Sequence, residues 1–312
     1  MKSKMTLRLW QVTAVLAAAL LAFSCEKPAN GGTDKNEGDT AVADTLNVAT
    51  FNIRYATSED TGVKSWASRK ESCFASVKDN EFDVVGFQEV LAKQQADLKE
   101  GLTDYSFEFV GRDDGVNGEA VGIGYRSSRL KALDMGKFWL SSTPDEPSNA
   151  VDWGATVVRK RVALWIKFED RNTKKQFYFL ATHLEVGEDN ANVRTRSAKL
   201  IIEREAAVNT EGLPFFVVGD MNPIAPTEKS MQQLRTVFSD TFQEGDAAGL
   251  REGPIGTYNA FNPNANLESQ SKRGDYIFAK GDYELKRFRV VDTKYNGQYP
   301  SDHIPVVITV TL

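Results

Sequence analysis

Segments rich in β-forming residues recur along the chain from Leu46 to its last residue. Ten of them are predicted to be strands, because valine, isoleucine, phenylalanine and tyrosine concentrate there and turn residues separate them. In order, they are LNVATFNIRY, DVVGFQE, YSFEFVG, AVGIGYR, RVALWIKFED, KQFYFLATHLE, LPFFVVGDMN, GDYIFAK, LKRFRVVDT and PVVITVTL. LPFFVVG and DVVGF are apolar at successive positions, which predicts strands that are buried on both faces.

Apolar residues at helical spacing predict helices between some of these strands, at residues 66–80, 90–101, 191–210 and 227–235. This proportion of strand to helix is too strand-rich for one doubly wound parallel sheet. It favours an α+β fold in which two sheets pack face to face and the helices lie outside. The strands that are apolar on both faces agree with such layers, because each sheet is then covered twice.

The first 45 residues follow a different pattern. Residues 1–24 combine a basic start with an apolar stretch, which is the plan of a secretory signal. Cys25 follows directly, as in a bacterial lipoprotein signal whose cysteine becomes the lipidated N-terminus; an ordinary cleaved signal with an incidental cysteine is the alternative. Residues 25–45 are predicted to form a flexible tether, because they have too little apolar surface to fold. Residues 46–312 are predicted to form one catalytic domain.

The charge of the chain weighs against a dedicated nucleic-acid-binding protein. Without residues 1–24, which hold three basic residues and no acid, 35 Lys and Arg stand against 43 Asp and Glu, a net charge of −8. Because binding to a phosphate backbone favours a basic surface, nucleic acid would require a local basic patch. Cys73 lies in the helix predicted at 66–80 and is expected to be a small core residue.

Polar side chains stand at the ends of six predicted strands. Each alone would be an ordinary turn residue. Together they suggest a site, because strand ends on one edge of a sheet converge in space, and convergent carboxylates repel one another unless a cation lies among them. The set comprises Asn52, Glu89, His183, Asp220, Asn222, Asp275, Asp302 and His303.

This oxygen-rich set predicts a site for a hard divalent cation. Carboxylates and carboxamides suit Mg²⁺, Mn²⁺ or Ca²⁺. The chain has only two histidines, His183 and His303, and no cluster with zinc spacing, so zinc is not expected. Imidazoles beside such a metal fit hydrolysis of a phosphate ester, since they donate to the charge that builds in the transition state. Asp275 is expected to orient His303.

Six motifs in this order resemble the endonuclease/exonuclease/phosphatase superfamily: TFNIRY, VVGFQEV, ATHLE, VVGDMNPIAPT, GDYIFAK and YPSDHIPVV. The resemblance runs from about Leu46 to Leu312. It implies a four-layer α/β/β/α sandwich of two mostly antiparallel or mixed sheets with outer helices, which agrees with the layers predicted above. It also implies that Asn52, Glu89 and Asp302 hold Mg²⁺ or Mn²⁺, with Glu89 as the principal ligand.

The same resemblance implies catalytic roles for the other members of the set. His183 is expected to contact the phosphate or the leaving group. Asp220 is expected to orient the attacking water, and Asn222 to bind a phosphate oxygen. Asp275 is expected to orient His303, which acts as a general base or as a group that stabilises transition-state charge.

Three arginines are expected to bind substrate. The segment around Glu119 resembles secreted bacterial members of the superfamily, in which this turn and Arg159 or Arg161 lie near the site. Arg194 matches a family arginine that follows the histidine strand; a solvated surface role is the alternative for all three. The motif ATHLE departs from the N-T-H-L-D of many members, notably at Glu185, which changes local substrate contacts and keeps the histidine.

These features predict a phosphoesterase that hydrolyses a phosphate mono- or diester by metal-assisted attack of water. A nuclease would need basic loops, and a sphingomyelinase-like phosphodiesterase would need an aromatic docking loop. The segment around Phe138 and Trp139 is a candidate for such a loop, but aromatic residues of a buried strand explain it equally well. A phosphatase on a sugar or inositol phosphate needs a small polar pocket, to which Lys160 would also contribute. A non-catalytic surface binding module would lack Glu89 or His303. We expect a monomer, anchored in the cell envelope by its lipid, with nucleic acid not favoured as a partner.

The lipoprotein prediction is tested by Cys25→Ser. This variant should move from the membrane fraction to the soluble fraction, because the lipid supplies the attachment. Fractionation and immunoblotting measure the shift, and Cys73→Ser is the matched control that should stay with the membrane. Wild-type protein recovered in the soluble periplasmic fraction would contradict lipidation of Cys25.

Overall fold

Two stacked β-sheets form the centre of the computed structural model, which describes residues 44–312. The first sheet contains, in spatial order, β10 (Arg251–Glu252), β12 (Glu284–Val290), β13 (Val306–Thr311), β1 (Thr45–Asn52), β2 (Val84–Val90), β4 (Ala120–Arg126) and β3 (Tyr105–Gly111). The second contains β5 (Leu130–Trp139), β6 (Val162–Asp170), β7 (Gln176–His183), β8 (Phe215–Asp220), β11 (Asp275–Lys280) and β9 (Ser239–Asp240). Both sheets are mixed, because β1–β2, β7–β8 and β10–β12 are parallel pairs.

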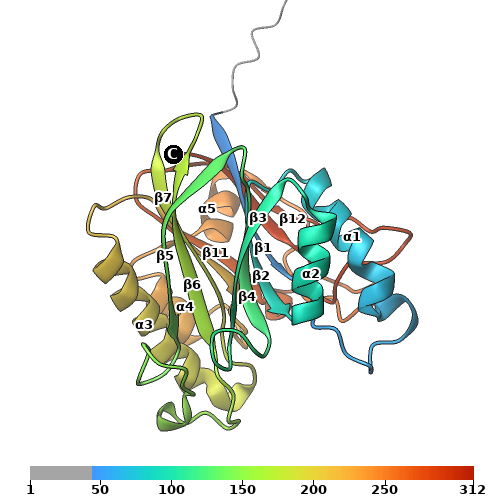
Figure 1. Ribbon diagram of the computed structural model, residues 1–312, viewed down its shortest axis with the longest axis horizontal. Helices are drawn as coiled ribbons and strands as arrows, with labels where there is room; N and C mark the ends of the chain where they lie inside the picture. The colour runs from blue at the N-terminus through green and yellow to red at the C-terminus, as the bar shows by residue number, and fades with distance from the viewer. Residues whose placement is uncertain (1–43) are drawn as a thin grey trace, which may run out of the picture. The chain divides into compact units, whose positions relative to one another are not determined.

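Helices cover the outer face of each sheet (Figure 1). α1 (Trp66–Asp79) and α2 (Ala92–Gly101) lie on the first sheet, and α3 (Ala191–Val208) and α4 (Lys229–Leu234) on the second. α5 (Thr241–Ala248) packs against β11 and β12. Short 3₁₀ turns occupy Gly62–Lys64, Val151–Trp153, Glu188–Asn190 and Gln270–Lys272. The predicted four-layer α/β/β/α sandwich is confirmed.

The alternation of side chains along the central strands creates three hydrophobic cores. In β7, Phe179 points to the other sheet and Leu180 to the helical layer. In β8, Val218 points to the other sheet and Val217 to the helical layer. Because both faces of these strands are buried, their sequences are apolar at successive positions.

The two sheets lie in close contact at Gly86, near the end of β2 where the chemistry is expected. A Cβ atom on Gly86 of β2 would lie 2.5 Å from Cγ2 of Val218 and 2.9 Å from Cβ of Ala181. A glycine is therefore needed for β2 to lie against β7 and β8 at this distance. Gly86 is three residues before Glu89, so this contact fixes the end of β2 relative to the ends of β7 and β8.

Two of the longer elements, β5 and α5, are not predicted by the sequence pattern, and neither are the two-residue strands β9 and β10. β5 is an edge strand with exposed Asp134 and Met135 and a bulge between Ala132 and Asp134, so it lacks a regular alternation. α5 is short and buries little more than one turn of side chains. The first predicted strand extends to Tyr55, but β1 ends at Asn52, because the chain turns at Arg54 with a φ of +56°.

Cys73 is buried on α1, which confirms its place in the core. Its thiol donates to the carbonyl oxygen of Pro300 at 3.1 Å, and burial raises its pKa to about 11. Cys25 and the predicted signal lie outside the described residues. No helix within residues 44–312 is long and apolar enough to cross a membrane.

Candidate active site

The topology brings the ends of six strands to one end of the molecule. β1 runs parallel to β2, and β7 to β8, so their carboxyl ends lie together. β11 and β13 are antiparallel to β8 and β1 and therefore begin there. The register pairs His183 with Asp220, and Asp220 with Asp275. The structure thus brings together all eight polar residues from the predicted strand ends.

A pocket with a volume of about 490 Å³ opens among these residues. Asn52 and Asp275 are buried behind it and form hydrogen bonds with its lining. The other six line it directly: Glu89, His183, Asp220, Asn222, Asp302 and His303.

Glu89 is directed into the pocket by an irregularity in β2. The register between β2 and β4 shifts between Phe87 and Val90, and Glu89 has a left-handed φ of +63°. This conformation costs a non-glycine residue about 1–2 kcal/mol, and such strain is typical of functional sites. Two donors hold the carboxylate: the Asn52 amide lies 3.0 Å from Oε1, and the Tyr55 backbone N–H lies 3.1 Å from Oε2.

Mutual repulsion among the carboxylates indicates where a cation fits. Burial raises the pKa of Asp302, and the negative charge of Glu89 adds to the rise. Burial also raises the pKa of Asp220 to about 6, with Asp275 and Glu89 adding repulsion. A divalent cation relieves such repulsion, and carboxylate and amide oxygens are its preferred ligands. Glu89, Asp302 and Asn52 therefore fit a site for a hard divalent cation.

His303 is held in place by Asp275. Its Nδ1 lies 2.8 Å from Asp275 Oδ2, an oxygen that also accepts a hydrogen bond from the Thr257 hydroxyl at 2.6 Å. Burial alone disfavours charge on the ring, but Asp275, Asp220 and Asp302 outweigh it and hold the pKa of His303 well above its usual value. Its Nε2 lies 3.7 Å from Asp220 Oδ2. His303 is therefore an imidazolium at neutral pH, with a proton on Nε2 at the pocket.

His183 is in the opposite protonation state. Burial first, and then the positive charges of Arg161 and His303, lower the pKa of His183 well below its usual value. Its Nε2 lies 3.6 Å from Asp220 Oδ2. A neutral and a charged imidazole thus flank one carboxylate; the charged ring has two N–H donors, and the neutral ring has one N–H donor and one lone pair.

Asp220, Asp275 and His303 each bring one possible ligand atom within 4.8 Å of the others. In this group, however, Asp275 Oδ2 is bound by the His303 ring and by Thr257, and a protonated imidazole has no lone pair for a metal. We therefore assign Asp275 and His303 to proton chemistry and the Glu89 side of the pocket to the cation.

A tight turn after β8 carries Asp220 and Asn222 to the pocket. Gly219 has a φ of +151°, and a Cβ atom there would lie 2.0 Å from the carbonyl oxygen of Thr182, so a side chain does not fit. Asn222 has a φ of +48°; its backbone N–H donates to Asp220 Oδ1 and its amide to the Leu184 carbonyl, each at 3.1 Å. These bonds fix the Asn222 side chain at the pocket wall.

The three arginines predicted to bind substrate separate into two groups. Arg159 and Arg161 line the pocket. Arg194 does not, because its side chain is fully buried and bound to Glu228 at 2.7 and 2.8 Å and to two backbone carbonyl oxygens of the loop after β7. Arg194 therefore supports that loop, and its expected role as a substrate ligand is corrected.

Burial and position decide two further points. Phe138 and Trp139 are 1% and 3% exposed, so of the two alternatives the buried strand aromatics are the correct one, and these residues offer no docking loop. Lys160 does not line the pocket, and its ammonium group donates to the carbonyl oxygen of Asp113.

Sequence reasoning misses several residues of the site, among them Thr257 and Tyr258, which contact Asp275 and His303 respectively. The Thr257 hydroxyl donates a hydrogen bond to Asp275 and also accepts hydrogen bonds from the backbone N–H groups of Gly274 and Asp275, each at 3.1 Å. Tyr258 is 43% exposed, lines the pocket and places its ring 5.0 Å from that of His303. Both lie in a loop without hydrophobic periodicity, so no sequence signal distinguishes them from ordinary polar loop residues.

The fold and the site together define a hydrolase that acts on phosphate esters. The sequence model of the Endonuclease/Exonuclease/phosphatase family matches residues 49–303, and the chain belongs to this family. No curated protein matches the sequence.

Solved structures from the same family are similar over nearly the whole described chain. A mannosyl-6-phosphatase of Bacteroides thetaiotaomicron VPI-5482 is 31% identical, with a TM-score of 0.76 over 86% of this chain and 100% of that one. An endonuclease/exonuclease/phosphatase of Bacteroides vulgatus is 31% identical, with a TM-score of 0.77 over 86% and 99%. The D. rerio TDP2 complexed with a single-stranded DNA product is 19% identical, with a TM-score of 0.66 over 86% and 99%, and shares the fold.

The pairing of His303 with Asp275 predicts the effect of removing the ring. His303→Ala should lower kcat on p-nitrophenyl phosphate by about two to four orders of magnitude, the range of a positioned acid–base or charge-stabilising group. His183→Ala should also be severe, and the double variant should lose less than the product of both, because the rings act on one transition state. Thermal unfolding should change little in either single variant. If His303→Ala destabilises the protein but the molecules that remain folded are fully active, His303 is a packing residue and not a catalytic one.

Proposed function

We propose that the protein is a divalent-metal-dependent phosphatase that hydrolyses a phosphate monoester of a sugar. The observation that carries this proposal is the make-up of the pocket, in which a carboxylate and amide cluster adjoins two histidines of unlike charge and three arginines. The 31% identity to a mannosyl-6-phosphatase supports a sugar phosphate as the substrate class.

The metal-holding residues in this proposal are Glu89, Asp302 and Asn52, with Mg²⁺ or Mn²⁺ as the ion. When bound, the ion supplies positive charge to the non-bridging oxygens of the phosphate. The oxygen-only donor set and the repulsion among buried carboxylates support this assignment.

The remaining residues divide the reaction among them. Asp220 is ionised at neutral pH and accepts a hydrogen bond from the attacking water. The water oxygen bonds to phosphorus, the bond from phosphorus to the sugar oxygen breaks, and one water proton ends on the released hydroxyl. His303 donates from Nε2 to the charge that builds on the phosphate, and His183 donates to a phosphate oxygen or the leaving group. Asn222 holds a further phosphate oxygen.

The walls of the pocket suit a polyhydroxylated ring. Glu119 contributes a carboxylate, which forms hydrogen bonds with hydroxyls. Tyr258 contributes a partly exposed aromatic ring. A hexose presents hydroxyls at its edge and C–H groups on its face. The hydroxyls can bond to the polar groups of the pocket, and the C–H face can pack on the Tyr258 ring.

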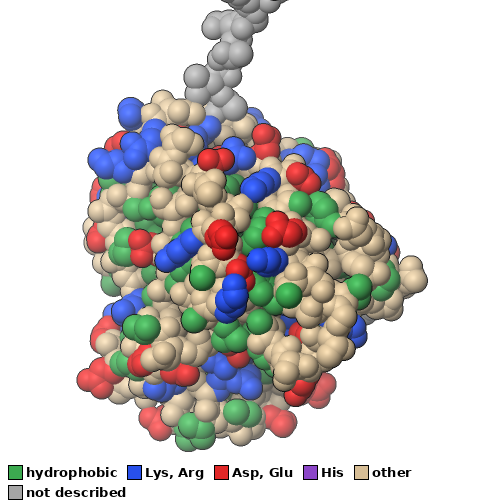
Figure 2. Space-filling view, turned by 45° about the vertical axis from the view of Figure 1, so that its right-hand side comes forward, with side chains coloured by type: hydrophobic (Ala, Val, Ile, Leu, Met, Phe, Trp, Pro, Cys, Tyr) green, Lys and Arg blue, Asp and Glu red, His purple; other side chains and the backbone are tan. Residues whose placement is uncertain are grey.

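The alternatives have less support. On the face shown in Figure 2, lysines and arginines are interspersed with acids, whereas a nuclease needs a basic surface. The buried positions of Phe138 and Trp139 speak against docking of a sphingomyelinase-like enzyme on a bilayer. A non-catalytic binding module does not account for Glu89 and His303, both of which are held by hydrogen bonds at the pocket.

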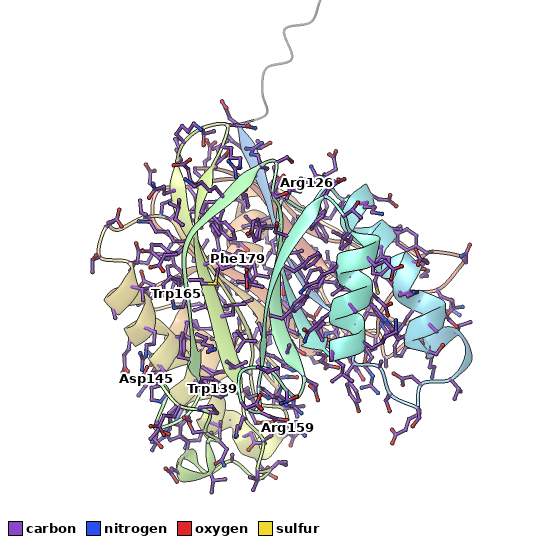
Figure 3. All side chains as sticks on the ribbon, viewed as in Figure 1. Arg126, Trp139, Asp145, Arg159, Trp165 and Phe179 are labelled. Carbon is purple, nitrogen blue, oxygen red and sulfur yellow. The ribbon has the colours of Figure 1, made fainter. Side chains whose placement is uncertain are left out.

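We further propose that the protein is a monomer, anchored in the cell envelope through a lipid on Cys25. β1 begins at Thr45 and reaches the site at Asn52, which spans about 25 Å for eight strand residues. Arg159 accordingly lies at the end of the domain opposite the start of β1 (Figures 1 and 3). The pocket then opens away from the end at which the chain enters the domain, which suits a soluble substrate.

The metal assignment predicts a specific dependence. Activity should vanish in EDTA and return with Mg²⁺ or Mn²⁺, because the ligands are oxygens. Glu89→Gln should raise the Mg²⁺ concentration for half-maximal activity at least tenfold and leave thermal unfolding without metal nearly unchanged. Titration of activity against free Mg²⁺ measures the shift, with Glu108→Gln on β3 as the control. Full activity in EDTA, or recovery with Zn²⁺ alone, would contradict the site.

The substrate class predicts an order of rates. Release of inorganic phosphate from mannose 6-phosphate and glucose 6-phosphate should exceed release from inositol phosphates, while sphingomyelin and plasmid DNA remain intact. Tyr258→Ala should raise KM for the hexose phosphates about tenfold and change KM for free p-nitrophenyl phosphate less. Preferential cleavage of plasmid DNA or sphingomyelin would overturn the sugar-phosphate proposal.

A further inference from the structure

Glu185 holds two of the three arginines that line the pocket, Arg159 and Arg161, on one carboxylate. It lies two residues after His183 and is 2% exposed. Its Oε1 lies 3.2 Å from Nη1 of Arg159 and 3.4 Å from Nη2 of Arg161, and its Oε2 lies 3.5 Å from Nε of Arg161. The backbone N–H of Val186 donates to Oε1 at 3.1 Å, so the carboxylate itself is fixed.

The charges in this group do not cancel. Two guanidinium groups share one carboxylate, so a unit of positive charge is left over, and Arg159 retains 30% exposure of its side chain towards solvent. The neighbouring Arg112 and Glu119, by contrast, form a one-to-one pair at 2.7 Å. The wall near His183 therefore offers positive charge to the same anion that a cation at Glu89 would attract.

The space beside Arg161 is very small. A cavity of about 10 Å³ lies between Glu89, His183, Arg161 and the Arg112–Glu119 pair. This volume is that of one water molecule or one oxygen atom. The pocket of about 490 Å³ and this oxygen-sized cavity adjoin each other, because Glu89, Glu119, Arg161 and His183 line both of them.

Phosphate monoesters and diesters differ in the features that this wall distinguishes. A monoester carries up to two negative charges near neutral pH, with a second pKa of about 6, and three non-bridging oxygens. A diester carries one charge, and its third oxygen continues into a second organic group. The surplus positive charge and the oxygen-sized cavity match a third non-bridging oxygen, and the cavity is too small to hold a second ester chain.

We propose that Glu185 is a positioning residue that holds Arg159 and Arg161 as a clamp for the third non-bridging oxygen of a terminal phosphate, and that this clamp selects monoesters over diesters. The inference rests on the proposed phosphatase function and adds the residues that set its selectivity. Arg159 and Arg161 contact the phosphate, whereas Glu185 acts through them.

The test compares p-nitrophenyl phosphate with bis-p-nitrophenyl phosphate in Mg²⁺. Arg159→Gln should lower kcat/KM on the monoester about tenfold to a hundredfold, change kcat/KM on the diester less than about threefold, and raise the inhibition constant of inorganic phosphate. Glu185→Gln should lower kcat on the monoester to a similar degree without raising the inhibition constant of phosphate, because both positive charges remain but are misplaced. Glu185→Asp, which keeps the charge, should recover part of the lost kcat.

Glu205→Gln is the matched control. Glu205 lies on α3, is 1% exposed and forms an ion pair with Lys280 of β11 at 2.9 Å. It does not line the pocket. It should leave the ratio of monoester to diester rates unchanged. Equal losses on both substrates in Arg159→Gln, or a stably folded Glu185→Gln with wild-type kcat on the monoester, would overturn the clamp. A wild-type preference for the diester would overturn the clamp and leave phosphoester hydrolysis intact, whereas inactivity on both esters would overturn the proposed function itself.

Discussion

Repulsion among carboxylates gathered at one end of two sheets is the interaction on which the rest of the site depends. Asp220, Asp275 and Asp302 are almost fully buried, and Glu89 lies beside them. Such a group is tolerated only if positive charge and hydrogen-bond donors compensate it. The protonated His303 supplies positive charge, and the Asn52 amide and the Tyr55 backbone N–H donate hydrogen bonds to the Glu89 carboxylate. The charge that remains is the physical reason for placing a divalent cation there.

The sandwich makes this arrangement rigid. Each polar residue follows or precedes a strand that is apolar on both faces, so its backbone is locked by two cores. The contact of Gly86 with Val218 and the contact of Gly219 with Thr182 set the distance between strand ends. Strain at Glu89 and Asn222 is sustained by this surrounding structure, which holds catalytic groups more accurately than a flexible loop would.

Around that fixed centre, the two sides of the pocket have different chemistry. The Glu89 side gathers negative charge and calls for a cation, whereas the Arg159 and Arg161 side carries surplus positive charge. A phosphate bound between them experiences attraction from both, which orients it before reaction. The partly exposed ring of Tyr258 lies at the mouth, where the organic part of a substrate would rest. Selectivity for that part therefore depends on loops, while the chemistry depends on strand ends.

The sequence by itself determined the layers, most of the helices and the eight polar residues of the centre, because these follow from local periodicity and from motifs whose residues stand at strand ends. It did not determine the roles of residues whose partners are distant along the chain. Arg194 is bound to Glu228, and Thr257 to Asp275, so only the fold could assign them to support. The sequence around Phe138 and Trp139 is equally consistent with core residues and with a docking loop, and only their burial in the structure shows that they are core residues. Glu185 appeared as a small departure from a motif, and only the tertiary structure brought two arginines onto it, because ion pairs depend on distance in space rather than on order in sequence.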